Sequence, residues 1–246
     1  AQVTRFASTT GALLSITMED PFGDPAVRRG IAQAMPYQDL IDAVYKGNAL
    51  KFESPLAPFV AGWTSDFGIA QDMDAAKAAL APIAGAELTL DYGIGTLAGE
   101  PAALLVQAAL NEAGLDVSIN GNERTVQQNK VASRETINFV DVLNTPLFPI
   151  ATYYYDLYWL PEFGFLNWVG YANDEMNALK PALNQLAGPE FDTAVRRAQE
   201  IAMTDLSFIP LVWTGEFRGT TNGLNVNAAY TGNGLLKWQD LEWSAA

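Results

Sequence analysis

The most informative absences from this sequence are cysteine and histidine, neither of which occurs among its 246 residues. Without them the chain has no disulfide, no thiolate nucleophile, no Cys/His zinc site and no Ser-His-Asp triad. No apolar run approaches the roughly 20 residues that a membrane-spanning helix needs. The N-terminus also lacks a charged segment followed by an apolar one, so a signal peptide is expected only in a longer parent protein.

Basic residues are scarce as well. The chain has 14 lysines and arginines against 28 acidic residues, which gives a formal net charge of −14. Nucleic acid is therefore not expected as a partner, because its phosphates require a cationic surface. The acidic charge could steer a cationic ligand toward the protein, but a solvated acidic surface explains it more simply. We expect no metal and no other cofactor.

Residues 24–47 carry the clearest helix signals. Asp24 is a good N-cap, and Pro25 suits the first helical position, whose N–H has no acceptor within the helix. Apolar residues at helical spacing follow, and Gly47 supplies the left-handed conformation that ends a second helix. Two arginine pairs are expected on solvated or ion-paired helix faces, Arg28–Arg29 and Arg196–Arg197.

A strand–helix–strand unit is predicted over residues 87–119. Residues 87–92 alternate apolar and polar side chains, a helix begins near Gly99 and ends at Gly114, and residues 115–119 form the second strand. Strands joined by a helix in this way lie parallel, with a right-handed crossover. The two strands are therefore expected to be neighbours or one strand apart.

The remaining segments alternate between strand and helix patterns. Further strands are predicted over residues 13–18, 148–159 and 207–213, and further helices over residues 72–80, 125–133, 170–179 and 191–206. Expected connections are an ordered loop over residues 48–68, a turn at residues 120–121 and irregular surface structure over residues 214–246. This alternation predicts an α/β fold, with a mixed or largely parallel sheet flanked by helices.

Several stretches also resemble, in order, patterns of the family 5 (oligopeptide and dipeptide type) solute-binding proteins of ABC importers. The resemblance extends from about residue 13 to residue 213. The matching residues are Asp24, Val27, Arg28, Ile31, Ala34, Ile41, Val44, Gly47, Ala76, Lys77, Leu80, Gly85, Gln107, Leu110, Gly114, Leu115, Val117, Tyr171, Asn173, Glu175, Leu179, Ala198, Gln199, Ile201, Asp205, Ile209, Pro210 and Leu211.

Complete members of that family are roughly twice as long, and this chain resembles their second half. The resemblance implies the second lobe of a type II periplasmic-binding-protein fold. Residues 1–213 would form the ligand-binding lobe, and residues 214–246 a C-terminal return segment that packs on the missing first lobe. With half of the cleft absent, the chain is expected to bind the parent's solute at least ~100-fold more weakly.

The function implied by the resemblance is that of a monomeric periplasmic binding protein and not of an enzyme. It would capture a peptide-like or other small polar solute between two lobes by hinge closure, and deliver that solute to a membrane permease. Relatives carry oligopeptides, dipeptides, opines, oligosaccharides and metal chelates. The absence of histidine argues against direct ligation of nickel by this lobe.

The densest candidate for solute contact is the aromatic segment at residues 151–162. Aromatic side chains offer large contact areas at low entropic cost, and a carboxylate can hold an ammonium group. Peptide-binding relatives carry a W-x-x-D-Y-P-D-P motif near this place, which this sequence lacks, and Asp156 stands closest to its aspartate. The candidate ligand-binding residues are Tyr154, Tyr155, Asp156, Tyr158 and Trp159, with Arg124 and Arg134 as candidate clamps for a ligand carboxylate.

Two interpretations of the aromatic segment stay open on the sequence. Either it lines the cleft, with at least two of its five candidate side chains exposed in one concavity, or it is a buried aromatic strand. Two other classes of function also stay open. One is an acid-pair hydrolase, which needs carboxylates about 5–9.5 Å apart; the candidates are Asp141, Asp156, Glu162 and Asp174, for which solvated surface acids are the simpler interpretation. The other is a non-transport binding or regulatory domain with the same fold.

Overall fold

The parallel unit predicted over residues 87–119 is present. The computed structural model describes residues 2–96, 99–136, 138–142, 148–160, 166–230 and 236–243. Within it, strand β3 (Glu87–Ile94) pairs in parallel with β4 (Asp116–Glu123) along its whole length. Helix α4 (Gly99–Glu112) joins the two strands, and Gly114 follows it with a φ of +104°. The prediction that the two strands are parallel neighbours is confirmed.

A six-stranded mixed sheet contains this unit, with the strand order β2-β6-β1-β5-β3-β4. The short β5 (Phe139–Val142) lies parallel to β3, and the long β1 (Gln2–Ser15) lies antiparallel to β5 and to β6 (Phe208–Thr220). At the edge, β2 (Ala49–Lys51) pairs antiparallel with β6. Two further strands, β7 (Leu224–Asn225) and β8 (Glu242–Trp243), form a separate small sheet.

The helices between these strands begin where the sequence predicts capping. Asp24 accepts backbone hydrogen bonds from Ala26 (2.7 Å) and Val27 (3.4 Å), as expected of an N-cap, and Gly47 has a φ of +76°. The helical segments are α1 (Pro25–Ala34), α2 (Tyr37–Asp39), the π-helical η1 (Leu40–Val44), α3 (Met73–Leu80), the 3₁₀-helical η2 (Ala81–Ile83), α5 (Arg124–Ala132), α6 (Ala151–Tyr158), α7 (Asp174–Ala178), α8 (Lys180–Leu183), α9 (Pro189–Asp205) and the 3₁₀-helical η3 (Trp238–Asp240).

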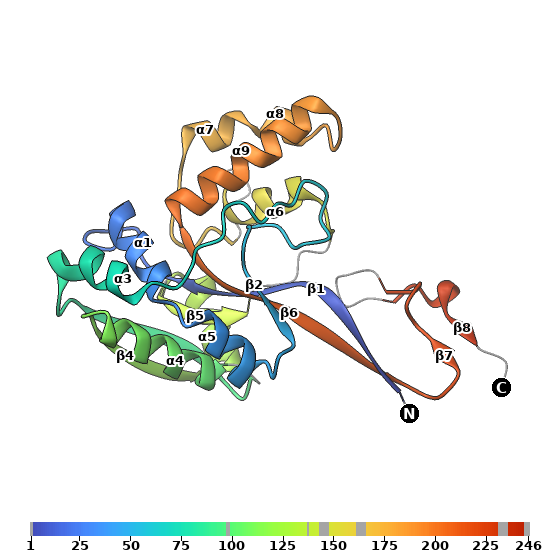
Figure 1. Cartoon of the computed structure of the whole chain (residues 1–246), viewed down its shortest axis with the longest axis horizontal. Helices are drawn as coiled ribbons and strands as arrows, with labels where there is room; N and C mark the ends of the chain where they lie inside the picture. Colours follow the sequence, from blue (N-terminus) through green and yellow to red (C-terminus); the bar gives the residue numbers. More distant parts are fainter. Residues whose placement is uncertain are drawn as a thin grey trace.

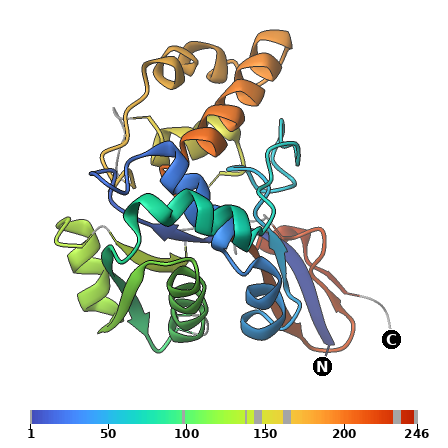
Figure 2. The same cartoon turned by 60° about the vertical axis from the view of Figure 1, so that its left-hand side comes forward.

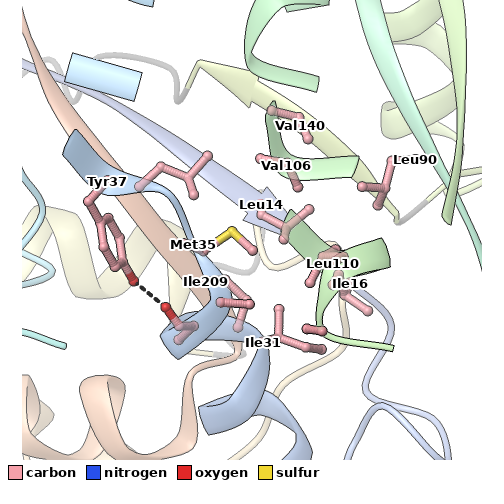
Figure 3. Packing of buried hydrophobic residues seen from close by; sticks show 14 of the residues in the cluster. Leu14, Ile16, Ile31, Met35, Tyr37, Leu90, Val106, Leu110, Val140 and Ile209 are labelled. Atoms are coloured by element: carbon pink, nitrogen blue, oxygen red, sulfur yellow. Dashed lines mark hydrogen bonds between the residues drawn. The ribbon is translucent and has the colours of Figure 1, made fainter. Parts of the chain in front are cut away.

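One face of the sheet is covered by α1, α3 and α4, with α1 and α3 side by side (Figure 1, Figure 2). Aliphatic side chains dominate the core on this face. Figure 3 shows Leu14 and Val140 from the strands beside Val106 from α4. The Tyr37 hydroxyl donates to the Ala32 carbonyl (2.8 Å), so this buried phenol has a partner.

The opposite face carries a core that is richer in aromatic residues. It is built by α5, α6 and α9 and includes Phe139, Phe208 and Trp213 from the strands. Because successive side chains of a strand point to opposite faces, Leu13 belongs to this second core and Leu14 to the first. The result is a three-layer α/β fold, a mixed sheet flanked by helices, as predicted.

Arg28 is fully buried, contrary to the expectation that the Arg28–Arg29 pair is solvated. Its guanidinium donates to five backbone carbonyls, those of Leu206 (2.6 Å), Ser207 (2.7 Å), Thr17 (3.1 Å), Phe22 (3.2 Å) and Ile16 (3.4 Å). Burial lowers the pKa of Arg28 to about 10, so the group stays charged at neutral pH. The charge is tolerated because its N–H groups are satisfied by carbonyls that other elements leave free. The second pair is ion-paired as expected, Arg196 with Asp66 and Arg197 with Glu175 and Glu200.

The strand predicted over residues 148–159 is wrong, because residues 151–158 form helix α6. High β-propensity of the tyrosines suggested a strand. The buried residues Ala151, Tyr154, Tyr155 and Tyr158 nevertheless follow the spacing i, i+3, i+4, i+7, which is the spacing of one helical face. Tertiary packing against the aromatic core decided between the two.

Two smaller expectations about connections are also wrong. Residues 120–121 lie inside β4 and form no turn, since Asn120 and Gly121 continue the parallel pairing with β3. Strand β6 does not stop at residue 213 but runs to Thr220. Residues 215–220 pair with residues 2–7 of β1 as the β1–β6 ribbon, which leaves the sheet and carries the N-terminus at its tip (Figure 1).

Candidate functional site

The five aromatic-segment candidates lie together, four on α6 and Trp159 directly after it, but not on an open surface. Four of them are buried in the second core, with exposed fractions of 5% or less, namely Tyr154, Tyr155, Tyr158 and Trp159. Burial raises the pKa of Tyr155 and Tyr158 well above the ordinary value, so both phenols stay protonated. The expectation that at least two of the five are exposed in one concavity is therefore wrong. The helical conformation turns consecutive tyrosines toward one core rather than toward two sheet faces.

Asp156 lies on the outer side of α6 and is half-buried. Its carboxylate is 3.9 Å from the ammonium of Lys180 in α8, so its charge is already balanced within the chain. A ligand ammonium at Asp156 would have to compete with that lysine.

Arg124 and Arg134 do not form one clamp. Both are exposed, Arg124 at the first residue of α5 and Arg134 just beyond its end, with a φ of +57°. At a rise of ~1.5 Å per residue, ten residues separate them by about 15 Å along the helix. A single small carboxylate cannot contact both.

A concavity lies instead at the root of the β1–β6 ribbon. It has a volume of about 300 Å³ and is lined by Arg5, Phe6, Leu50, Pro58, Trp213, Thr214 and Gly215. We call it the ribbon pocket. Trp213 pairs with Gly11 of β1, and the next residue, Ala12, pairs with Val142 at the end of β5. The pocket thus lies at the edge where the parallel strands have their carboxyl ends, a frequent place for ligands in α/β sheets.

A β-bulge in β6 orients Trp213 toward this pocket's side of the sheet. Pro210 pairs with Leu13 and Val212 with Ala12, so Leu211 is an extra residue in the ladder. In a regular strand, Phe208 and Trp213, five positions apart, would point to opposite faces. With the bulge, both belong to the aromatic core. Pro210 fits here because a bulge tolerates a residue without an N–H.

The indole of Trp213 is held from three sides. It stacks on Phe52 with ring centroids 4.4 Å apart and meets Tyr154 edge-on at 6.2 Å. A Cβ on Gly11 would lie 3.1 Å from the indole, so the absence of a side chain there makes room for it. Tyr154 of α6 therefore supports the wall of the ribbon pocket from within the core.

Arg5 provides the charge beside this apolar wall. Its side chain is exposed, and in the parts of the chain that the structure describes it has no carboxylate within ion-pair distance. A Cβ on Gly215 would be 3.0 Å from Arg5 Nε, so the guanidinium stem crosses the ribbon over this glycine. The pocket thus combines apolar walls with one cation.

A polar network lies farther along the same edge, on β3 and β4. Asp91 accepts hydrogen bonds from Asn120 (2.7 Å) and Asn122 (3.0 Å) and lies 3.7 Å from Lys130. Desolvation opposes ionisation of Asp91, but the hydrogen bonds from Thr136 and the two asparagines, together with the charge of Lys130, outweigh it and lower the pKa of this carboxyl. These contacts satisfy Asp91 and join α5 to the sheet.

No sequence pattern indicates the ribbon pocket. Trp213 stands at the end of a run predicted to be a strand, and Arg5 and Leu50 have no motif around them. Among the described residues, no group of three or more acidic, cysteine or histidine side chains is placed to hold a metal ion. In the same parts of the chain, no helix combines the length and apolar character that crossing a bilayer requires. Of the residues suggested for an acid pair, Glu162 lies outside the described residues.

Comparison with known proteins identifies the architecture. Residues 2–165 match the family model of the bacterial extracellular solute-binding proteins, family 5 Middle. The comparison with curated proteins returns no matching sequence. Among solved structures, the Helicobacter pylori periplasmic binding protein DppA in complex with the peptide STSA matches 98% of this chain and 49% of its own length, at 20% identity and a TM-score of 0.83.

Two further structures give the same result. The dipeptide-binding protein from Pseudoalteromonas sp. SM9913 in complex with Met-Leu matches 99% of this chain and 50% of its own, at 17% identity and a TM-score of 0.82. The oligopeptide-binding protein AppA from Bacillus subtilis in complex with a nonapeptide matches 99% and 52%, at 17% identity and a TM-score of 0.83. The chain spans about half the length of the solved structures it matches.

Proposed function

The chain belongs to the bacterial extracellular solute-binding proteins of family 5, and we propose that it forms one of two lobes between which a whole protein of this kind holds a peptide or another small polar solute. The family match over residues 2–165 is the observation that carries the proposal. Proteins of this family bind solutes and are not enzymes. In the proposal, the bound solute is delivered to the permease of an ABC importer by a monomeric protein in the periplasm.

The division of the chain follows from the same proposal. Residues 1–213 form the lobe, and residues 214–246 return to the other lobe. The β1–β6 ribbon supports this, because it carries both residues 2–7 and residues 215–220 away from the sheet in one direction (Figure 1). Beyond it, Trp238 and Trp243 have exposed fractions of 76% and 69%. Large exposed aromatic residues commonly mark a surface that another domain covers.

Solute contact is assigned to the carboxyl edge of the parallel strands, where the ribbon pocket lies. The sequence-based candidates take a supporting role in this proposal: Tyr154 packs against Trp213, and Tyr155, Tyr158 and Trp159 belong to the same aromatic core. Arg124 is retained as a contact at the same edge, because α5 begins where β4 ends. Arg134, at the far end of α5, is not.

The test is a thermal-shift screen of the full-length parent against peptides, sugars and opines. A solute that binds only the folded protein stabilises it by RT ln(1 + [L]/Kd), so its melting temperature rises with the logarithm of the solute concentration above Kd. The proposal expects a rise with at least one solute class, and binding to the 246-residue chain at least ~100-fold weaker, since losing several buried contacts removes roughly 3 kcal/mol.

Three results would contradict this proposal. A parent that binds no solute would favour a non-transport role for the fold. Turnover of a bound peptide or glycoside, measured as released product by chromatography, would favour the hydrolase alternative. Equal affinity of the chain and the parent for one solute would contradict the division of the site between two lobes.

A further inference from the structure

We propose that the ribbon pocket is a subsite for an apolar side chain with an adjacent carboxylate, the chemistry of the C-terminal residue of a peptide. The inference deepens the proposed function and rests on it, because it names the part of a solute that this lobe recognises. It stands on three observations: the shape of the pocket, the exposed apolar side chains near it and the unpaired charge of Arg5.

The size of the pocket suits one side chain. Its volume of about 300 Å³ lies at the lower end of the ~300–1,000 Å³ that small-molecule sites span. Leu50, Pro58 and Trp213 supply apolar walls. Because Trp213 is fixed by Phe52 and Tyr154, this wall is already in place before a ligand arrives.

Further apolar side chains near the pocket are exposed in the described part of the chain. Val3 is 71% exposed, Leu50 49% and Phe217 45%, and all three lie on the sheet face that carries Arg5 and Trp213. Phe59, next to Pro58 in sequence, is 41% exposed. Exposed apolar side chains near a pocket commonly mark a binding site.

The charge at the pocket is complementary to a carboxylate. Arg5 has no ion-pair partner in the described parts of a chain whose net charge is −14. A guanidinium presents paired donors that match the two oxygens of a carboxylate. By contrast, Arg218 on the opposite face of the ribbon is 3.1 Å from Glu216, which also accepts from the Tyr230 hydroxyl. The same ribbon therefore has one satisfied arginine and one that is free.

The experiment uses the 246-residue chain and a pair of probes that differ only in charge. N-acetyl-L-phenylalanine carries the phenyl group and the carboxylate, and N-acetyl-L-phenylalaninamide replaces the carboxylate with a neutral amide. Affinities are measured by ligand-observed NMR titration. We expect the acid to bind about tenfold more tightly than the amide, which corresponds to ~1.4 kcal/mol.

Variants then assign this preference to Arg5. Arg5→Gln should bind acid and amide equally, and Arg5→Lys should keep part of the preference, because an ammonium retains the charge but not the paired donors. Leu50→Asp should weaken both probes by removing the apolar wall, and should weaken the acid further because the new carboxylate repels its charge. The matched control, Arg218→Gln, should keep the full preference. Melting temperatures within about 2 °C of wild type show that the exposed substitutions leave the fold intact.

Several results would overturn the inference. They are the absence of binding by both probes, equal binding of acid and amide to the wild-type chain, a preference that survives Arg5→Gln, or one that Arg218→Gln removes equally. The proposed function has a separate outcome, since the solute screen uses the unmodified parent. If the parent binds solutes but the 246-residue chain binds neither probe, the subsite is contradicted and the proposed function stands. If the 246-residue chain prefers the acid but the parent binds no solute, the proposed function is contradicted and the preference of the pocket for a carboxylate stands.

Discussion

Trp159 gives the sharpest test of whether the aromatic segment belongs to the core. Its side chain is 5% exposed, and its ring packs at 5.5 to 6.0 Å, centroid to centroid, from those of Tyr158, Tyr155 and Phe208. Burying a tryptophan removes about 200 Å² from water, which at ~25 cal/mol per Å² corresponds to roughly 5 kcal/mol. Truncation of a buried aromatic residue to alanine costs about 3–5 kcal/mol. We expect Trp159→Ala to lower the free energy of unfolding by about 4 kcal/mol.

The assay is urea unfolding followed by circular dichroism, with calorimetry for the melting temperature. In a chain of this size each kcal/mol shifts the melting temperature by about 2–4 °C, so Trp159→Ala should melt about 8–16 °C below wild type. The matched control is Trp238→Ala, which removes the same side chain from a position that is 76% exposed. That variant should stay within about 0.5 kcal/mol of wild type.

A Trp159→Ala chain that melts within about 2 °C of wild type would refute this reasoning. It would show that the ring is not packed in the core, and it would restore the sequence-based expectation that Trp159 contacts solute. A loss as large for Trp238→Ala would point to a different fault, namely that the C-terminal segment is part of the cooperative core.

Three further predictions test single residues. Arg28→Met should destabilise the chain by more than about 4 kcal/mol, because five carbonyls lose their donor. Its control, Arg29→Met at an exposed position, should change the free energy of unfolding by less than about 0.5 kcal/mol. Equal urea midpoints for the two variants would contradict the burial of Arg28. Asp24→Ala should cost about 1 kcal/mol in the same assay through loss of the N-cap, and no change would contradict the cap. Asp91→Asn should cost about 2 kcal/mol at pH 7. The folded-state pKa of Asp91 is lowered from 3.8, so its contribution to the free energy of unfolding is full above 3.8 and is lost as the pH falls through the folded-state pKa. The difference in stability between wild type and variant should therefore close on acidification. A difference that stays constant from pH 6 to the acid transition would contradict the lowered pKa.

Elements with local signals were predictable from the sequence. The helix after Asp24 begins where its carboxylate can accept backbone N–H groups, and this needs only residues within one turn. The parallel unit of β3, α4 and β4 follows from alternation, a helical period and Gly114, and its handedness is nearly fixed by the chirality of the chain. The family resemblance rests on these same elements, and the family match confirms it.

The aromatic segment shows where local signals compete. The β-propensity of its tyrosines favours a strand, whereas their spacing favours a helix, and the sequence alone does not decide between the two signals. The helix is formed because it turns Tyr154, Tyr155 and Tyr158 together toward Phe208 and Trp213, which come from a distant part of the chain. Burial in the tertiary structure therefore explains why the segment is a helix. It also explains why these tyrosines are not exposed for contact with a solute.

What the sequence determined by itself is the fold class, most of the element order and the family, because caps, periods and turns act over a few residues. What only the tertiary structure decided is the ribbon pocket. Arg5 and Trp213 come from opposite ends of the chain and meet because β1 and β6 pair. Trp213 shares the face of Phe208 because β6 bulges at Leu211, and the sequence does not reveal such a bulge before the strands are in register. A site made by long-range pairing has no local pattern, since its residues share a place only after folding.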